Sequence, residues 1–220
     1  MKQIHKVGLI IFLILLADQW LKIYIKTHFN YGESFFLLGQ EWAQLHYVEN
    51  EGMAFGITFD WTYGKLLLSV FRVVMIGGLF WYIRQLIAHR APAAFLYCIA
   101  LITAGAIGNM IDSAFYGMIF DVSGDQSYEI AKIVPFGQGY APFLHGKVVD
   151  MFYFPLTTIH FPEWMPVIGG TDYRFFSYIF NVADAAITVG LLYILLFQRH
   201  FLKKETPAPV PPPAEAPVES

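Results

Sequence analysis

Charged side chains are scarce in this sequence. Only 14% of its 220 residues are charged, 56% are hydrophobic, and the mean hydropathy is +0.50. Soluble globular domains carry about 25% charged residues. The deficit indicates that lipid surrounds much of the chain, and the length suits a single packed domain.

Cysteine and excess positive charge are lacking as well. Cys98 is the single cysteine, which excludes an internal disulfide framework and a zinc site built from cysteines. The net charge of −3 and the pI near 6.1 give no basic surface for nucleic acid. The His-Glu-x-x-His, Gly-x-Ser-x-Gly, Ser-x-x-Lys and Walker motifs are also missing, which argues against zinc, serine and nucleotide-dependent hydrolases.

Long apolar runs are what the sequence has instead. Each is close to the ~20 residues that a helix needs to cross the hydrocarbon core; they cover residues 7–25, 66–83, 93–111 and 178–197. No small-x-small cleavage site follows the first run, so we read it as a retained span. We predict an all-α membrane protein, a four-helix transmembrane bundle within residues 1–204, and a disordered cytoplasmic tail at 205–220.

Basic residues indicate the orientation of these spans. They fall on one side of a four-span layout, which is therefore cytoplasmic together with both termini: Lys2, Lys6, Arg84, Arg90, Arg199, Lys203 and Lys204. The outer connections, residues 26–65 and 116–177, are long. We expect them to form a small periplasmic β/loop subdomain, with the alternating residues 44–48 in a sheet. Trp42, Trp61 and Trp164 in these connections suit anchoring at the membrane interface.

Several acidic and small residues lie in or beside the spans, where a carboxylate costs about 2.5 to 3.5 kcal/mol. Asp18 lies four residues before Lys22, the spacing of a structural ion pair within a helix. Gly105, Asn109 and Asp112 form one helical stripe. Close helix packing through small and polar residues is one explanation of that stripe.

Two further carboxylates are expected at the outer face. Asp150 interrupts the apolar segment 148–152, and Asp184 lies near the start of the fourth apolar run. Two carboxylates held close together share a proton, so that one acts as a base on water while the other polarises a carbonyl. The sequence alone leaves open whether the two aspartates meet.

The order of these motifs resembles that of the lipoprotein signal peptidase family, also called signal peptidase II, over about residues 4–200. The matching motifs are Asp18-Gln19-x-x-Lys22, Asn50-Glu51-Gly52-Met53-Ala54-Phe55-Gly56, Gly105-x-x-Gly108-Asn109-x-x-Asp112, Gly146-Lys147-Val148-Val149-Asp150 and Phe180-Asn181-x-Ala183-Asp184. The resemblance implies that Asp150 and Asp184 are catalytic, and that Asp18 and Lys22 are structural. It implies that six others shape or support the site: Asn50, Gly52, Asn109, Asp112, Asn181 and Ala183.

The same resemblance implies an activity and a location. The family removes the signal peptide of prolipoproteins just before a cysteine that bears a diacylglyceryl group, needs no metal or organic cofactor, and is inhibited by globomycin. It implies a bacterial inner membrane protein, in contact with lipid, whose active site lies towards the periplasmic face.

The chain departs from the family pattern at two places. Ser113 follows Asp112 where the family usually has Arg, so a cation that orients substrate is either missing or supplied from elsewhere, with Lys147 and Arg174 as candidates. Residues 118–145 form an insert, which is either a surface elaboration that touches substrate or a partner or a tolerated surface loop; we expect the second.

Other interpretations remain open on sequence grounds. Residues 47–57 are read either as a cover for the site with glycine hinges or as an ordinary hairpin turn. A small proton-coupled transporter would use Asp18, Asp112 and Asp184 as relay sites. A non-catalytic assembly factor would use the polar stripes only to join helices.

Overall fold

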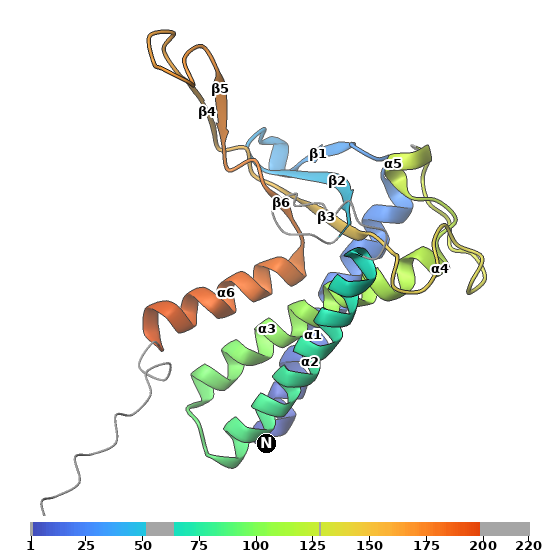
Figure 1. The fold of residues 1–220 in the computed structure, drawn as a ribbon, viewed down its shortest axis with the longest axis vertical. Coiled ribbons are helices and arrows are strands. Elements are labelled where there is room, and N and C mark those ends of the chain that lie inside the picture. The colour runs from blue at the N-terminus through green and yellow to red at the C-terminus, as the bar shows by residue number, and fades with distance from the viewer. Residues whose placement is uncertain (1, 52–63, 128, 199–220) are drawn as a thin grey trace, which may run out of the picture.

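The protein consists of a bundle of helices with a small β-sheet at one end (Figure 1). A computed structural model describes residues 2–51, 64–127 and 129–198. The helices are α1 (Gln3–His28), α2 (Gly64–Ala88), α3 (Ala93–Ile111), α4 (Gly117–Ile119), α5 (Gly124–Ser127) and α6 (Val182–Phe197). A 3-10 turn covers Leu37–Gly39, and a π-helical turn, Asp112–Tyr116, joins α3 to α4. Helix α3 is central, because it packs against α1, α2 and α6.

Three helical stretches are long and apolar enough to cross a membrane: Gln3–His28, Leu66–Ala88 and Ala93–Ile119. They agree with the first three predicted spans. Helix α6 is apolar but has 16 residues and begins at Val182, later than predicted. The reason is local, because the Asn181 side chain caps the helix by accepting a hydrogen bond from the Asp184 amide at 2.9 Å. The predicted tail at 205–220 lies outside the described residues.

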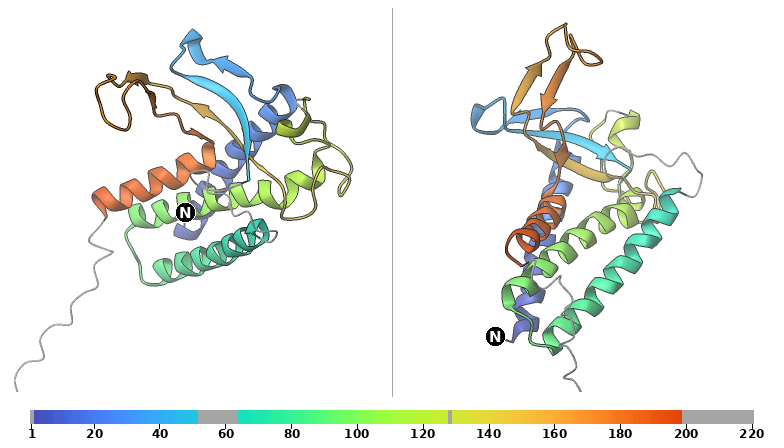
Figure 2. Two further views of the ribbon diagram at one scale, coloured as in Figure 1. Left: turned by 45° about the horizontal axis from the view of Figure 1, so that its top comes forward. Right: turned by 60° about the vertical axis from the view of Figure 1, so that its left-hand side comes forward.

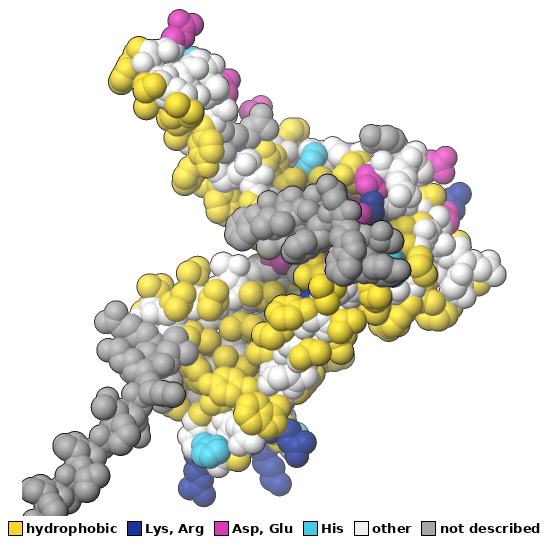
Figure 3. Space-filling model, viewed as in Figure 1, with side chains coloured by type: hydrophobic (Ala, Val, Ile, Leu, Met, Phe, Trp, Pro, Cys, Tyr) yellow, Lys and Arg dark blue, Asp and Glu magenta, His cyan; other side chains and the backbone are white. Residues whose placement is uncertain are grey.

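The surface of the bundle is apolar, as a lipid-facing surface requires. Hydrophobic side chains cover the helices in Figure 3, and Lys and Arg side chains gather at the end of the bundle farthest from the sheet. Large exposed side chains such as Phe12, Phe71 and Leu196 would be costly in water over so wide an area. This distribution supports a helical membrane protein.

The sheet at the other end of the bundle has the strand order β1-β2-β3-β6. Its strands are β1 (Ser34–Phe36), β2 (Gln44–Asn50), β3 (Val148–Tyr153) and β6 (Ile179–Phe180), and neighbouring strands are antiparallel. The strand expected at residues 44–48 is therefore present. A register shift in β2 leaves Val48 opposite Asp150, and Phe152 lies opposite Phe180. This pairing holds β3 beside the start of α6.

A two-stranded arm, β4 (Thr157–His160) with β5 (Asp172–Phe175), projects from the sheet away from the helices (Figures 1 and 2). Trp164, in the loop of this arm, is 79% exposed. Trp42 is also exposed, as interfacial anchoring requires, whereas Trp61 lies outside the described residues.

The insert at residues 118–145 corrects one prediction. It is not merely a surface loop, because Phe120 and Ser123 are fully buried and Ala131 is nearly so. Phe120 belongs to the same hydrophobic cluster as Tyr47 of β2. The Ser123 hydroxyl donates a hydrogen bond of 2.6 Å to Glu49, the residue before Asn50. The insert therefore forms part of the core that holds β2 in place.

Candidate active site

Glycines on α3 allow α6 to approach closely. A Cβ atom at Gly105 would lie 2.2 Å from the Ala183 carbonyl oxygen, and one at Gly108 would lie 2.6 Å from an Asp18 carboxylate oxygen. Real Cβ atoms do not approach so closely, so glycine is required at Gly105, where the neighbour is backbone of α6, whereas at Gly108 the Asp18 side chain of α1 would have to move. The packing interpretation of this stripe is confirmed, and the close approach brings Asn109 next to the start of α6.

An enclosed charged cluster lies where α1, α3 and α6 meet. The Lys22 ammonium lies 3.0 Å from Asp18 and 2.8 Å from Asp112, and all three side chains are fully buried. Asp18 also accepts from the Ala183 amide at 2.9 Å, and Asp112 accepts from the Val149 amide at 3.3 Å. The predicted pair of Asp18 and Lys22 is thus part of a triad that joins three helices to strand β3.

Asp150 and Asp184 are held by amides. Asp150 accepts from Asn181 Nδ2 at 2.6 Å and from Asn50 Nδ2. Asp184 accepts from Asn109 Nδ2 at 2.8 Å and from the Asn181 backbone amide at 3.4 Å. Asn181 therefore contacts both carboxylates and links the two.

The surroundings of Asp150 favour its neutral form. Burial, and secondarily the nearby charge of Asp184, raise the pKa of Asp150 to about 8. A carboxyl group that keeps its proton near neutral pH is able to donate a hydrogen bond to a carbonyl oxygen. Only 2% of Asp150 is exposed, so it acts from within the wall of the site.

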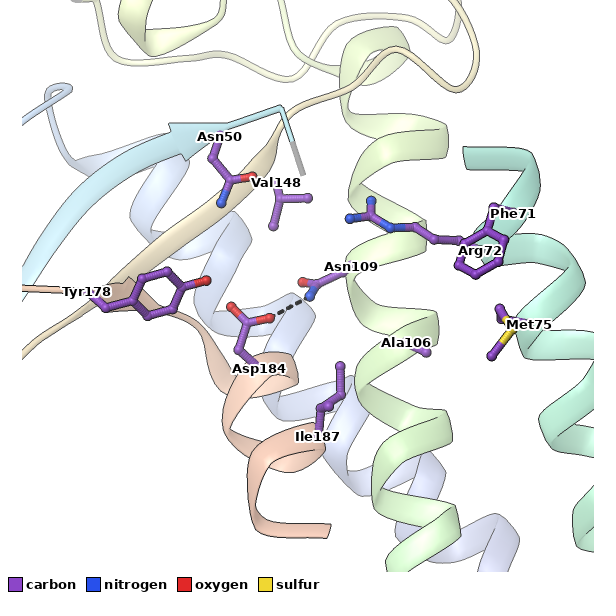
Figure 4. Close-up of a pocket in the computed structure, with 10 residues that line it drawn as sticks. All are labelled: Asn50, Phe71, Arg72, Met75, Ala106, Asn109, Val148, Tyr178, Asp184 and Ile187. Atoms are coloured by element: carbon purple, nitrogen blue, oxygen red, sulfur yellow. Dashed lines mark hydrogen bonds between the residues drawn. The ribbon is translucent and has the colours of Figure 1, made fainter. Parts of the chain in front are cut away.

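A cavity of about 270 Å³ lies between α2, α3, α6 and the sheet (Figure 4). Its polar lining residues are Asn50, Arg72, Asn109, Tyr178 and Asp184. The remaining wall is largely apolar and includes Phe71, Met75 and Ile187. Asp184 faces this space directly, and Asp150 is connected to it through Asn50.

Most of the residues expected at the site come together. Five of them form one hydrogen-bonded group: Asn50, Asn109, Asp150, Asn181 and Asp184. Asp112 belongs to the enclosed cluster behind this group, and Ala183 contacts that cluster through Asp18. Gly52, and the part of the suggested cover from Gly52 onward, lie outside the described residues.

Arg72 supplies a positive charge to the cavity, and it was not among the cations predicted from the sequence. Lys147 pairs with Asp125 at 2.5 Å and with Glu51 at 3.3 Å, and Arg174 belongs to strand β5 of the projecting arm. Lys147 is not among the described lining residues of the cavity, whereas Arg72 of α2 is. The sequence does show Arg72 as the charged residue within the apolar run 66–83, although not that α2 places it at the cavity.

The arrangement suits proton transfer. Asn181 bridges the buried carboxyl group of Asp150 and the half-buried carboxylate of Asp184, and Asp184 opens on a cavity of mixed polarity. Such a pair activates water and polarises a carbonyl without a metal ion.

Comparisons with known proteins identify the family of this chain. The family model for Signal peptidase (SPase) II matches residues 10–199. A lipoprotein signal peptidase of Porphyromonas gingivalis is 46% identical over 191 residues, which cover 86% of this chain and 81% of that protein. One of Amoebophilus asiaticus is 35% identical over 201 residues, or 90% of this chain and 79% of that protein.

A solved structure shares the fold. It is described as a bacterial membrane enzyme at 2.3 Å resolution, and it aligns with a TM-score of 0.56 at 20% identity, over 93% of this chain and 95% of that one. The family match covers most of the chain, including every motif quoted above. The chain belongs to the signal peptidase II family.

Proposed function

We propose that this protein is an intramembrane aspartyl endopeptidase that removes the signal peptide from diacylglyceryl-modified prolipoproteins. Cleavage occurs on the N-terminal side of the lipidated cysteine. The observation that carries the proposal is the pair Asp150 and Asp184, linked by Asn181 beside a cavity. Family membership supports the same activity.

The reaction needs one proton shared between the two carboxylates. The ionised carboxylate, Asp184 on the cavity side, takes a proton from water, and the water oxygen attacks the peptide carbonyl carbon. The protonated Asp150 donates a proton to the carbonyl oxygen as the tetrahedral intermediate forms. Collapse of that intermediate breaks the C–N bond: Asp184 gives its proton to the leaving nitrogen, and Asp150 takes back the proton of the hydroxyl that becomes the carbonyl oxygen, which restores the starting pair.

The position of the site suits a substrate embedded in the membrane. The cavity lies at the junction between the helices and the sheet, at the end of the bundle opposite the gathered Lys and Arg side chains. By the positive-inside rule we assign that basic end and both termini to the cytoplasm. The active site then faces the periplasm of a bacterial inner membrane.

The walls of the cavity suit the proposed ligands. Phe71, Met75 and Ile187 offer apolar surface to a signal helix, to the acyl chains of the modified cysteine, or to a globomycin-type inhibitor. The polar residues lie on the side of the sheet, where the peptide bond is cut. The proposed chemistry requires no metal and no organic cofactor.

Cleavage of a diacylglyceryl-modified prolipoprotein by purified protein in detergent tests the proposal. Wild type should cleave, and Asp150→Asn and Asp184→Asn should each lose at least about 1,000-fold in kcat, because Asn preserves hydrogen bonding but not proton transfer. Asp172→Asn, on the exposed arm, is the matched control and should retain full activity.

Two outcomes would contradict the proposal. One is full activity in either active-site variant. The other is an inactive wild type that unfolds cooperatively and is therefore well folded. In the second case, proton flux in liposomes would be measured next, because a proton-coupled transporter predicts flux that depends on Asp184.

A further inference from the structure

Arg72 is a charged residue inside an apolar helix. A guanidinium in a membrane span is costly and usually faces a polar partner or a water-filled cavity. Figure 4 shows the Arg72 side chain extending from α2 towards Asn109 of α3. It lines the same cavity as Asp184.

Ser113 fixes the direction of the Arg72 side chain. Arg72 Nη1 donates a hydrogen bond of 3.2 Å to the Ser113 hydroxyl oxygen. The same hydroxyl donates to the Asn109 carbonyl oxygen at 3.1 Å, which commits its hydrogen to the backbone of α3. The Ser113 oxygen is thereby turned to accept from the guanidinium, so the orientation of Arg72 is set before any ligand binds.

The chemistry of a guanidinium defines what it binds. Its five N–H donors form a planar fork, and it stays charged under all ordinary conditions. A peptide in the cavity would lie between Arg72 on α2 and Asp184 on α6. Every residue of such a peptide offers a main-chain carbonyl oxygen, which accepts hydrogen bonds whatever the side chain is.

We propose that Arg72 is a substrate-binding residue that donates to a main-chain carbonyl oxygen of the peptide next to the bond that is cut. The inference rests on the peptidase function proposed above. It assigns recognition to α2, on the opposite wall of the cavity from Asp184.

The contact between positions 72 and 113 supplies a sharp test. Because the two side chains meet, one guanidinium is able to reach the same part of the cavity from either helix. A purely structural role for Arg72 within α2 would not be restored by moving the charge to α3. A role in binding substrate would be restored.

The experiment measures peptide affinity and turnover separately. A diacylglyceryl-modified signal peptide is titrated against detergent-purified protein in a non-cleaving Asp184→Asn background, and KM and kcat are measured in the cleaving background. Arg72→Gln should weaken binding and raise KM about 10- to 100-fold, as expected for loss of a charged hydrogen bond. Arg72→Lys should lose less, and Arg72→Gln/Ser113→Arg should recover most of the loss.

Arg84→Gln is the matched control, because Arg84 lies on the same helix and is exposed. It should leave both constants unchanged. Unaltered affinity in Arg72→Gln, or a loss that Ser113→Arg does not recover, would overturn the inference. Failure of wild type to cleave would instead count against the proposed function, and the affinity measurement would still decide the role of Arg72.

Discussion

Two groups of carboxylates lie close together in this protein, and they differ in what neutralises them. Asp18 and Asp112 share the ammonium of Lys22 and are completely enclosed. Asp150 and Asp184 are held by asparagine amides beside a cavity. An ammonium favours the ionised form of its carboxylates, whereas an amide holds a carboxyl group in place and leaves room for a proton.

Asn109 lies between the two groups and contacts both. Its Oδ1 accepts from Lys22 at 2.9 Å, and its Nδ2 donates to Asp184 at 2.8 Å. The amide orientation of Asn109 is therefore set by the charged cluster, and it directs an N–H towards Asp184. The enclosed group therefore fixes geometry, and proton transfer is the role that we propose for the group beside the cavity.

The largest expected effect comes from removing the cation of the enclosed cluster. Lys22→Met leaves Asp18 and Asp112 buried without their counter-ion, and breaking a buried pair in this way costs about 3–5 kcal/mol. We expect a strongly lowered unfolding temperature in detergent and little folded protein. Lys6→Met, at an exposed position near the start of the same helix, is the control and should unfold like wild type. Normal stability in Lys22→Met would show that the cluster does not hold the helices together.

The pH dependence of activity tests the second group. Because the pKa of Asp150 is raised to about 8, the pair keeps its shared proton below that pH. Activity should fall about tenfold per pH unit above about pH 8, as that proton is lost. Initial rates between about pH 5 and pH 10 measure this, and a profile flat to pH 10 would contradict it.

The free energy of unfolding should also depend on pH through the protonation of Asp150. The folded protein holds a proton on Asp150 that the unfolded chain has released, since an unfolded aspartate titrates near about pH 4. This stabilising contribution is therefore complete at low pH and declines as the pH rises from about 4 to about 8. Asp150→Asn should remove that slope, whereas Asp172→Asn should keep it.

The smallest expected effect on the unfolding temperature comes from replacing Lys147. Lys147 pairs with Asp125 and Glu51, whose side chains are 34% and 43% exposed. The Lys147 side chain itself is only 10% exposed, but its two carboxylate partners are open to water, and ion pairs open to water contribute about 0–1 kcal/mol. Lys147→Met should therefore change the unfolding temperature far less than Lys22→Met, and added salt should reduce the difference from wild type further. A loss as large as that of Lys22→Met would remove the distinction between enclosed and exposed pairs.

Much of this architecture was predictable because lipid imposes simple rules. The length of an apolar run fixes a helix, and the third predicted span, 93–111, coincides with α3. Asp18 and Lys22 were predictable because they are one turn apart on one helix. Spacing along the chain carried the information in both cases.

Features that depend on contacts between distant segments were not predictable in this way. The addition of Asp112 to the ion pair requires the packing of α1 against α3. The burial of Phe120 and Ser123 requires the insert to meet β2. The role of Arg72 as the cation of the cavity requires α2 to lie beside Ser113, and no local pattern records that proximity.

The enclosed cluster also has a consequence for how the chain is made. Helix α1 leaves the ribosome before α3. Its Asp18 and Lys22 form an ion pair with no net charge within one helix, so α1 is able to remain in the bilayer before α3 arrives. Helix α3 arrives later with Asp112 and finds its counter-ion already in the bilayer. The chain therefore supplies the Asp18–Lys22 pair before it supplies Asp112. Until α3 has packed against α1, Asp112 lacks its counter-ion Lys22.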